Sequence, residues 1–399
     1  MNLPDLLQIN LKNKKVIVRV DLNVPMKDGE ALDTSRITSL IPTIDYLCEQ
    51  GARIILISHF GRPEGKINPE MSLKQLLPSL EKCWGRDVSF GDDCIGPQAQ
   101  KIIQNLKSGD VILLENLRFH PEEEKNDSQF AQALATLGDL YVNDGFSVSH
   151  RAHASVDAIT QYLPSYPGLL MTKEIKALSQ ALNAPQKPLA AIVAGSKIST
   201  KLDLLKNLLE KVDLLILSGG IANTFLKSRN IAIGTSLYEP AMLETAKEIE
   251  KIAHDKQVEI ILPIDATGSH ETQNFVTMPL SNLPDSFKIL DIGPETVSLF
   301  KTKLSQARTV VWNGPLGVFE VPPFDQGTTA IAQTVAELTH DGKLFSIAGG
   351  GETLAALTNA KCSKKFSYLS TAGGAFLEWL EGKKLPGIMA LIKNKPQTC

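Results

Sequence analysis

Short apolar segments recur along the whole chain, and segments of helical periodicity separate them. The apolar segments are rich in Val, Ile and Leu and mostly do not alternate with polar residues, which is typical of strands buried on both faces. Strands that alternate with helices over this length predict parallel sheets covered by helices, an α/β fold. The predicted strands are Lys15–Leu22, Arg53–Phe60, Val111–Phe119, Leu140–Phe146, Leu189–Gly195, Leu214–Gly219, Glu259–Asp265, Lys288–Gly293, Thr309–Gly314, Lys343–Gly349 and Phe366–Thr371.

Three of the helices between these strands have clear apolar faces. Their apolar residues recur every three or four positions from Ile37 to Cys48, from Leu73 to Leu80 and from Leu202 to Val212. Ser72 and Gln75 have the spacing of a capping box, which predicts that the second of these helices begins there.

The chain has 399 residues, more than one ordinary core supports, and this length predicts two domains. Pro and Gly interrupt the sequence from Tyr162 to Gly168, a helical stretch covers 169–183, and a second break follows at Ala184–Pro188. We therefore expect two doubly wound, Rossmann-like parallel-sheet domains joined by a helix, with a cleft between them. The expected bounds are 1–168 for the first domain, 169–187 for the helix and linker, and 188–381 for the second domain.

The composition is that of an ordinary globular protein, with 43% hydrophobic and 21% charged residues. A net charge of −3 gives no reason to expect nucleic acid or an anionic membrane as a partner. The N-terminus has no features of a signal peptide, and no apolar run approaches the roughly 18–20 residues of a membrane span. The cysteines show no CxxC or framework spacing, so we expect reduced thiols and a cytoplasmic protein; they are Cys48, Cys83, Cys94, Cys362 and Cys399.

In the first half of the chain, the predicted strand ends carry arginine and polar side chains. Ligands of doubly wound sheets bind at the carboxyl ends of the strands. These ends bring Asn23, Arg62 and Arg118, and a loop after the fourth strand brings Arg151. Seven of the nine arginines precede position 152. Because Arg pairs bidentately with carboxylate and phosphate, this half predicts a site for a small polyanion; surface ion pairs are the alternative.

In the second half, the strand ends carry glycine instead. Gly349–Gly351 and Gly373–Gly374 each precede a helical sequence, and glycine there lets backbone N–H groups approach a phosphate closely. Lys197 and Lys201 follow another strand, and their spacing places them on one face of a helix start, where they could bracket a phosphoryl group. Tight turns and a solvated lysine pair are the alternatives. Together these features predict a phosphate-binding site.

Several familiar catalytic motifs are absent from the sequence. It has no GxxxxGK[ST] loop, no GxGxxG after the first strand, no HExxH and no GxSxG. His150 and His153 have no Cys or His neighbours that would complete a metal site. A polyanion site in one half and a phosphate-binding site in the other together predict a phosphotransferase. An NAD-dependent dehydrogenase and a non-catalytic, two-lobed anion-binding protein stay open as alternatives. The first should carry GxGxxG, and the second would not need the glycine-rich site.

Eleven short segments, in matching order and spacing, resemble the phosphoglycerate kinase family. They run from the first predicted strand to near the C-terminus. They are VRVDLNVP (18–25), SRI (35–37), SHFGRP (58–63), ENLRF (115–119), HRAHAS (150–155), GSKISTK (195–201), SGG (218–220), LDIGP (290–294), WNGPLGVFE (312–320), GGGET (349–353) and STAGG (370–374).

The resemblance implies a monomeric enzyme of glycolysis and gluconeogenesis. It transfers a phosphoryl group reversibly and in line between ATP and the carboxylate of 3-phosphoglycerate, which gives ADP and 1,3-bisphosphoglycerate, with Mg²⁺ carried by the nucleotide. The first domain is expected to bind the glycerate substrate and the second the nucleotide, with hinge closure bringing them together. Residues from about 382 to 399 are expected to return to the first domain.

The resemblance also implies roles for individual residues. Arg36 is further expected to aim its guanidinium, with the amides of a helix N-terminus, at an anion. The substrate-binding positions are Asp21, Asn23, Arg36, His59, Arg62, Arg118 and Arg151. The nucleotide-binding positions are Lys197, Lys201, Asn313, Glu320, Gly349, Gly350, Gly351, Glu352 and Thr353, with Glu352 serving the metal. The catalytic positions are Arg36, Lys197, Lys201, Gly351 and Gly374.

The chain departs from the usual pattern of the family in four segments. Glu352 stands where the family has Asp, which moves the carboxylate one methylene further out. Ala194–Lys197 reads AGSK in place of GGAK, and Ala372 replaces a glycine. The family's AFGTA becomes Gly145–Ser149, GFSVS. None of these departures removes a charged group that the resemblance needs.

Overall fold

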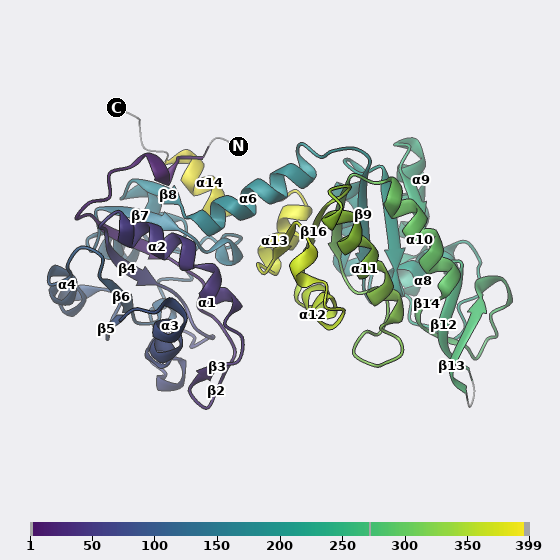
Figure 1. Ribbon diagram of the computed structural model, residues 1–399, viewed down its shortest axis with the longest axis horizontal. Coiled ribbons are helices and arrows are strands. Elements are labelled where there is room, and N and C mark those ends of the chain that lie inside the picture. The colour runs from purple at the N-terminus through teal and green to yellow at the C-terminus, as the bar shows by residue number, and fades with distance from the viewer. Residues whose placement is uncertain (1–2, 271–272, 395–399) are drawn as a thin grey trace. The chain divides into compact units, whose positions relative to one another are not determined.

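The computed structural model describes residues 3–270 and 273–394, and it divides into two compact units (Figure 1). The N-terminal unit runs to Ile175 and includes the residues from Lys384 onward, whereas the C-terminal unit is Lys176–Lys383. The division falls inside α6 (Leu169–Leu182), the helix expected between the domains. The end of the returning segment, with Cys399, lies outside the described residues.

The N-terminal unit is built on a six-stranded sheet in the order β5-β6-β4-β1-β7-β8. All neighbouring strands in it are parallel, as predicted. The predicted strands end earlier than expected, and the residues beyond their ends form the loops that carry candidate site residues. The strands are β1 (Lys15–Arg19), β4 (Arg53–Ile57), β5 (Ser89–Gly91), β6 (Val111–Leu114), β7 (Leu140–Asn143) and β8 (Ser165–Pro167), and a separate hairpin pairs β2 (Met26–Lys27) with β3 (Glu30–Ala31).

Alternate residues of the central strand β1 enter two different cores. Val16 and Val18 belong to the core that includes Ile44 and Leu47 of α2, whereas Ile17 belongs to the core formed with α4 and α5. Side chains of a strand point alternately to opposite faces, so helices cover both faces of this sheet. The doubly wound arrangement is therefore confirmed for this unit.

The apolar stripe from Ile37 to Cys48 forms two helices instead of one. Leu40 ends α1 (Ser35–Ser39) and also precedes α2 (Ile41–Glu49). Pro42, in the first turn of α2, has no N–H to continue the hydrogen-bond ladder of α1, which explains the break.

The capping box predicted at Ser72 is wrong. The Ser72 hydroxyl accepts from the Lys74 N–H, but Gln75 Nε2 donates to the Ser72 carbonyl instead of accepting from its N–H. The segment starts as a 3₁₀ helix, Leu73–Leu76, and continues as α3 (Leu77–Trp84).

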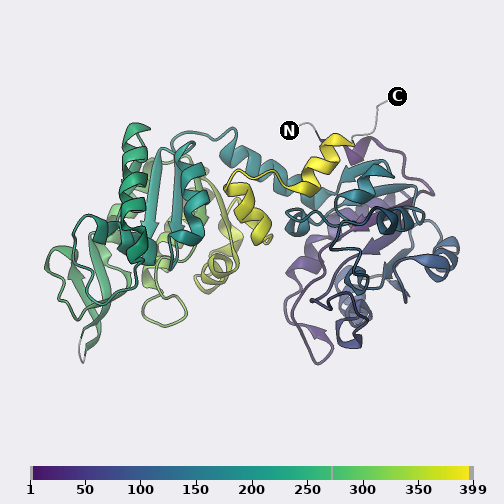
Figure 2. The same cartoon turned by 180° about the vertical axis from the view of Figure 1, so that it is seen from behind.

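The remaining helices of the N-terminal unit flank its sheet. The returning segment packs α14 against β8, and both views show it beside this unit (Figures 1 and 2). The helices are α4 (Gly96–Gln104), α5 (Ser128–Ala135) and α14 (Pro386–Lys393), with 3₁₀ helices at Leu6–Gln8, Pro69–Met71, Leu117–Phe119, Phe146–Val148 and Ala158–Gln161.

The C-terminal unit has a second parallel sheet of six strands, in the order β11-β10-β9-β15-β16-β17. One core of this unit joins Ile192 and Trp312 of the sheet to Phe300 and Ile331 of the helices α10 and α11. The helix α8 packs against β9 and β10. The strands are β9 (Leu189–Ala194), β10 (Leu214–Ser218), β11 (Glu259–Ile261), β15 (Thr309–Asn313), β16 (Phe345–Gly349) and β17 (Tyr368–Ser370).

A small antiparallel sheet was not predicted. β14 (Lys288–Ile292), which the sequence predicted as a strand of a parallel sheet, pairs antiparallel with β12 (Asp265–His270), and β13 (Gln273–Pro279) lies on the other side of β12. The predicted strand Glu259–Asp265 is wrong in extent, because β11 stops at Ile261.

The helices of the C-terminal unit follow its strands in the expected alternation. No helix in the described ranges is both long and apolar enough to cross a membrane. The helices are α7 (Leu202–Leu209), α8 (Gly219–Ser228), α9 (Leu243–Asp255), α10 (Pro294–Gln306), α11 (Gln326–His340), α12 (Gly351–Asn359) and α13 (Gly374–Leu380), with 3₁₀ helices at Ser199–Lys201, Pro240–Met242, Leu280–Asn282 and Ser363–Lys365.

Candidate active site

Arg36 and Asp21 form an ion pair at one end of the N-terminal sheet. Asp21 follows the end of β1, and its Oδ2 lies 2.7 Å from Arg36 Nη1. The same Nη1 donates to the Asn23 carbonyl at 3.0 Å, and the Ser147 hydroxyl donates to Asp21 Oδ2. The Asp21 side chain is 11% exposed and that of Arg36 is 32% exposed. Asp21 and the Asn23 carbonyl therefore fix the guanidinium while part of the Arg36 side chain stays accessible.

Gly61 links two further predicted residues to this end of the sheet. The Asn23 side chain accepts from the Gly61 N–H at 3.0 Å, and Arg118 Nη1 donates to the Gly61 carbonyl at 2.8 Å. Arg118 is buried, and its Nε is 3.0 Å from Glu124 Oε1. Arg62 comes next in the chain, is exposed, and makes no ion pair or side-chain hydrogen bond within the described ranges.

His59 is held by a buried arginine that the sequence did not single out. Arg19, fully buried at the end of β1, places its Nη2 3.2 Å from His59 Nδ1. Arg19 Nε donates to the Ser155 hydroxyl at 2.9 Å. Ser155 in turn donates its hydroxyl and its N–H to the two carboxylate oxygens of Glu123, at 2.5 and 2.9 Å. The chain of contacts thus ends in a buried carboxylate that balances the Arg19 charge.

The two buried histidines of this region are uncharged near neutral pH. Burial lowers the pKa of His59 well below its usual value, and the neighbouring cations Arg19, Arg118 and Arg151 lower it further. Burial, reinforced by the same cations, lowers the pKa of His153 to about 3. Positive charge at this site therefore comes from its arginines.

Lys201 is a partly buried lysine of the C-terminal unit. Its ammonium donates to the Ala194 carbonyl at the end of β9 and lies 3.5 Å from the Asn313 carbonyl at the end of β15. Burial lowers the pKa of Lys201 to about 8, and the Glu352 carboxylate opposes that shift. Lys197, by contrast, is exposed and precedes the helical turn, so the expectation that the two lysines share a helix face is wrong.

The glycine segment Gly349–Gly351, at the end of β16, lies beside Asn313 and Thr353. Asn313 Nδ2 donates to the Gly349 carbonyl at 2.8 Å, and the Thr353 hydroxyl accepts from the Gly314 N–H at 2.8 Å. Gly350 has φ +101°, and a Cβ there would lie 2.7 Å from Asn313 Nδ2, so glycine is required.

The first turn of α12 faces open space. A Cβ added to Gly351, the first residue of α12, would meet no other atom within 4 Å, and Glu352 beside it is exposed. Asn313 Oδ1 is buried without a hydrogen-bond partner among the described residues. Free amide donors, an open approach and a buried acceptor together make a place for a polar ligand. Gly374 similarly begins α13, after Gly373 with φ +53°.

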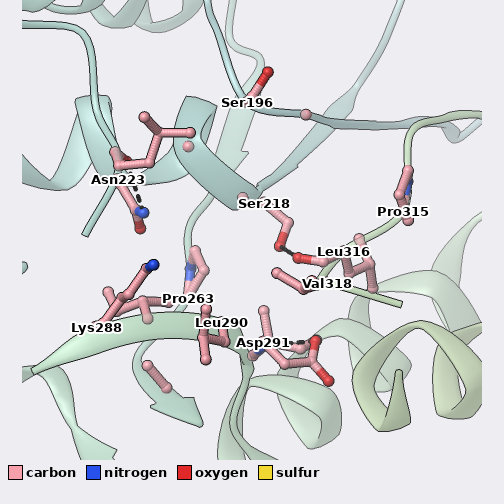
Figure 3. A pocket seen from close by; sticks show the side chains of 18 of the residues that line it. Ser196, Ser218, Asn223, Pro263, Lys288, Leu290, Asp291, Pro315, Leu316 and Val318 are labelled. Atoms are coloured by element: carbon pink, nitrogen blue, oxygen red, sulfur yellow. Dashed lines mark hydrogen bonds between the residues drawn. The ribbon is translucent and has the colours of Figure 1, made fainter. Parts of the chain in front are cut away.

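A cavity of about 530 Å³ adjoins these residues at the carboxyl ends of β9 and β10 (Figure 3). Asn223 of α8 and Lys288 of β14 reach into it, and Glu320 and Glu352 line it. Its walls are mostly apolar, with glycine where the backbone comes closest. The apolar and glycine residues are Gly195, Gly219, Gly220, Leu226, Leu237, Pro263, Ala266, Leu280, Ile289, Leu290, Ile292, Pro315, Leu316, Gly317 and Val318.

Asp291 lies on the floor of this cavity and was not predicted as a site residue. Its carboxylate accepts from the Ile292 N–H at 2.9 Å and from the Gly327 N–H, in the first turn of α11, at 2.7 Å. Burial raises the pKa of Asp291 to about 7 despite these hydrogen bonds. The carboxylate therefore ties the small antiparallel sheet to α11.

Comparisons with known proteins agree with this geometry. The family model described as phosphoglycerate kinase matches residues 6–383. Phosphoglycerate kinase of Methylorubrum extorquens (strain PA1) is 52% identical over 384 residues, which cover 96% of each chain. The chain belongs to the phosphoglycerate kinase family. As a family member it is an enzyme, since these kinases transfer a phosphoryl group between ATP or ADP and phosphoglycerate, a reaction of glycolysis.

Solved structures of phosphoglycerate kinases have the same fold. The enzyme from Coxiella burnetii is 42% identical, with a TM-score of 0.91. The match covers 99% of this chain and 100% of that enzyme. The enzyme from Pyrococcus horikoshii OT3 is 31% identical, with a TM-score of 0.81 and 98% of each chain covered. The resemblance that the sequence motifs indicated is therefore confirmed.

Two departures from the phosphoglycerate kinase pattern lie among the candidate site residues. Ser147 adds a hydroxyl that donates to Asp21, the partner of Arg36. Ser196 lines the cavity.

The structure also shows which residues the motifs left unassigned. Arg19, Glu123 and Ser155 form the buried support of His59. Arg19 lies in the segment VRVDLNVP and is the one charged residue of the run VIVRV (16–20), but no role was assigned to it. Asp93 Oδ1 lies 2.8 Å from His120 Nε2 beside Cys94, with ligand-type atoms of the three residues within 4.8 Å of one another. The Cys94 N–H also donates to Asp93 Oδ1.

Proposed function

We propose that the N-terminal unit binds 3-phosphoglycerate or 1,3-bisphosphoglycerate, and that the C-terminal unit binds ATP or ADP with Mg²⁺. The observation that carries this proposal is the contrast between the two sheet ends. One presents arginines held by carboxylates and carbonyls. The other presents open helix amides, one partly buried lysine and an apolar cavity. A small polyanion suits the first, and a base with a phosphate chain suits the second.

On the glycerate side, the accessible guanidinium of Arg36 meets the reacting carboxylate or phosphoryl group. Asp21 and the Asn23 carbonyl fix its orientation, so little rotamer entropy remains to be lost on binding. His59, Arg62, Arg118 and Arg151 are assigned to the remaining oxygens of the substrate, and Asp21 and Asn23 to its hydroxyl and to the loop that holds it.

On the nucleotide side, the apolar walls of the cavity accept the base, and Glu320 accepts hydrogen bonds from the ribose. Lys201, exposed Lys197 and the amides of Gly349–Thr353 are assigned to the phosphates. Asn313 is assigned to another part of the nucleotide, because its buried Oδ1 has no partner among the described residues and can accept from an N–H or O–H group of the ligand. Helix N-termini favour anions, so Gly351 and Gly374 add amide donors to the transferring group.

Glu352 is assigned to the Mg²⁺ that the nucleotide carries. Its carboxylate is exposed in the first turn of α12, beside the open space over Gly351. Hard divalent cations prefer such oxygen ligands. Glu352→Gln should raise the Mg²⁺ concentration for half-maximal activity by about tenfold, and Glu352→Asp by much less, since the charge is retained. An unchanged Mg²⁺ requirement in Glu352→Gln would remove this assignment.

The chemistry needs no general base, because the acceptor carboxylate is already ionised at neutral pH. What the protein supplies is in-line positioning and neutralisation of charge on the transferring oxygens, from Arg36 and Lys201. Because the two substrates are assigned to different units, we propose that the units close about a hinge when both are bound. Small-angle scattering with and without both ligands checks this, and equal dimensions would contradict it.

A coupled assay tests the proposal as a whole. ADP formation from ATP should depend on 3-phosphoglycerate and on Mg²⁺, without any change in nicotinamide absorbance that depends on an added alcohol or acid. Calorimetry should show ATP binding that survives Arg36→Ala and 3-phosphoglycerate binding that does not. We further propose a cytoplasmic monomer, which the free thiols Cys48, Cys83, Cys94 and Cys362 support as to compartment.

A further inference from the structure

The contact between Arg19 and His59 determines which nitrogen of the imidazole carries its proton. Arg19 Nη2 lies 3.2 Å from His59 Nδ1. A guanidinium carries only donors and does not lose its charge in a protein, so the nitrogen facing it must be the acceptor. A neutral imidazole has one protonated nitrogen, so the proton of His59 is on Nε2.

The orientation of Arg19 is fixed by the groups on its other side. All three groups of its fork are engaged, with Nε on the Ser155 hydroxyl, Nη1 on the Val20 carbonyl and Nη2 on His59. The Ser155 hydroxyl has one proton, which it donates to Glu123 Oε1 at 2.5 Å. It can therefore only accept from Arg19. The hydrogen bonds therefore run from Arg19 to His59 and to Ser155, and from Ser155 to Glu123.

The buried charges explain why this arrangement is stable. Arg19, Glu123 and Ser155 have no exposed surface. An unpaired charge there would be costly, and the Arg19 charge is compensated through Ser155 by Glu123. His59 itself stays neutral, because burial and the cations Arg19, Arg118 and Arg151 depress its pKa.

We propose that Arg19, held by Ser155 and Glu123, is a positioning residue that fixes neutral His59 as its Nε2–H tautomer, so that His59 binds the anionic substrate as a hydrogen-bond donor and not as a cation. The tautomer itself is argued from the contacts of Arg19. Only the statement that His59 binds the substrate rests on the proposed function. Near neutral pH, a carboxylate or phosphate oxygen accepts from Nε2–H in that orientation. With the opposite tautomer, Nε2 would present a lone pair and repel the anion.

Nitrogen NMR of the full chain labelled with ¹⁵N-histidine tests the tautomer in the absence of ligand. The chain has seven histidines, so the signal missing from His59→Gln assigns His59. We expect an unprotonated Nδ1 and a protonated Nε2 at pH 7. Arg19→Lys should keep this pattern, because Lys also only donates, whereas Arg19→Met should give a mixture of tautomers. A protonated Nδ1 or an imidazolium in the unmodified chain would overturn the proposal, and so would an unchanged pattern in folded Arg19→Met.

Arg19→Met leaves Glu123 buried without its counter-charge. The double variant Arg19→Met with Glu123→Gln, which restores neutrality, is therefore measured as well. If neither folds, two His59 variants still decide the question through substrate affinity. The amide of Gln extends to the position of Nε2, whereas that of Asn extends to the position of Nδ1. His59→Gln should bind 3-phosphoglycerate at least about tenfold more tightly than His59→Asn, since a hydrogen bond to a charged group is retained. Equal affinities, or tighter binding by His59→Asn, would overturn the proposal.

These readouts separate the inference from the proposed function. The tautomer is measured without turnover, so a chain that lacked kinase activity could still show Nε2–H. Conversely, an active enzyme with a protonated Nδ1 on His59 would support the proposed function but overturn the inference about the tautomer. Ser155→Ala completes the test: it should raise KM for 3-phosphoglycerate by about threefold to tenfold with a smaller change in kcat, because it removes the hydroxyl that links Arg19 to Glu123.

Discussion

The two units prepare for anions in opposite ways. In the N-terminal unit, charged side chains at the strand ends are held by other side chains, as Asp21 holds Arg36 and Glu123 balances Arg19. In the C-terminal unit, glycines bring backbone amides to the surface, and one partly buried lysine supplies the charge. Guanidinium forks select a substrate of fixed shape, whereas open amides accept a flexible phosphate chain. The difference teaches that the site proposed for the small substrate depends on side-chain geometry, and that the site proposed for the nucleotide depends on open space around the backbone.

The same contrast extends to the groups that support each site. Around His59 the support is a series of buried hydrogen bonds that ends in a carboxylate without exposed surface. Around Lys201 the support consists of main-chain carbonyls, from Ala194 and Asn313. Carbonyls provide no countercharge, which explains why burial lowers the pKa of Lys201 so far. Substitutions in the N-terminal unit should therefore act by removing charge. Substitutions in the C-terminal unit should act by filling space at the glycines or by changing the protonation of Lys201.

The largest effect is expected from Arg36→Ala. Removing the only fork that Asp21 orients should lower kcat by at least about 10²–10³, because charge on the transferring group loses a preorganised donor. Steady-state kinetics with both substrates saturating checks this. A loss of less than tenfold would remove Arg36 from its assigned role.

Two variants sharpen the Arg36 result. Arg36→Lys keeps the charge without the fork and should recover only part of the activity. Arg53→Ala is the matched control, because Arg53 begins β4 at the opposite end of the sheet and donates to the Asn13 carbonyl. Its kcat should stay within twofold of the unmodified enzyme, by analogy with other surface substitutions.

A smaller effect, about tenfold or more on the Kd of ATP, is expected from Gly351→Ala. A Cβ there meets no protein atom within 4 Å, so the free energy of unfolding should change by less than about 0.5 kcal/mol. Loss of affinity without loss of stability would show that the open space belongs to the ligand. Calorimetry and denaturant unfolding check the two quantities, and unchanged ATP affinity would contradict the assignment.

Gly350→Ala is the matched comparison for Gly351→Ala. Gly350 has φ +101°, and a Cβ on it would lie 2.7 Å from Asn313 Nδ2. This variant should lose stability as well as ATP affinity, by roughly 1–3 kcal/mol for a strained backbone. Comparing Gly350→Ala with Gly351→Ala then distinguishes a glycine that the fold requires from a glycine that only the nucleotide requires.

A pH-dependent effect is expected from Lys201. Its pKa in the ligand-free protein is lowered to about 8 by burial, so its charge is lost as the pH rises through that value. ATP affinity should fall by up to about tenfold per pH unit above 8, because phosphate binds the charged form. The unfolded chain keeps the higher lysine pKa and binds more protons between about pH 8 and 10.5. The cost of burying Lys201 is therefore present below pH 8 and relieved as the pH rises.

Lys201→Arg separates this effect from general alkaline inactivation. A guanidinium stays charged, so the ATP affinity of this variant should not fall between pH 8 and 9. Lys206→Arg, an exposed position on α7, should keep the slope of the unmodified enzyme. The same slope in all three proteins would show that another group titrates.

The sequence predicted the parallel sheets well, because strands buried on both faces read as continuous apolar runs. It did not predict the antiparallel sheet, since β12 (DATGSH) is short of apolar residues and its pairing with β14 is non-local. Pro42 was visible in the sequence, but the apolar periodicity across it hid the break between α1 and α2.

The candidate site was predictable wherever a strand end coincided with a motif, as at His59 and Gly349–Gly351. It was not predictable where a role depends on burial. Lys197 and Lys201 look equivalent in the sequence, yet one is exposed and the other is partly buried against two carbonyls. Arg19 and Glu123 are 104 positions apart, and only the packing of the folded chain brings them together through Ser155.

The smallest effect is expected from Ser147, where the chain departs from the usual family pattern. Its hydroxyl donates to the same Asp21 oxygen that pairs with Arg36, so it restrains the carboxylate that orients the guanidinium. Ser147→Ala should raise KM for 3-phosphoglycerate or lower kcat by about twofold to tenfold, the worth of one hydrogen bond. Ser147→Thr, which keeps the hydroxyl, is the matched variant. If Asp21→Asn abolishes the difference between Ser147→Ala and the unmodified enzyme, the hydroxyl acts through Asp21. An additive loss would instead show that Ser147 contributes to the site independently of that carboxylate.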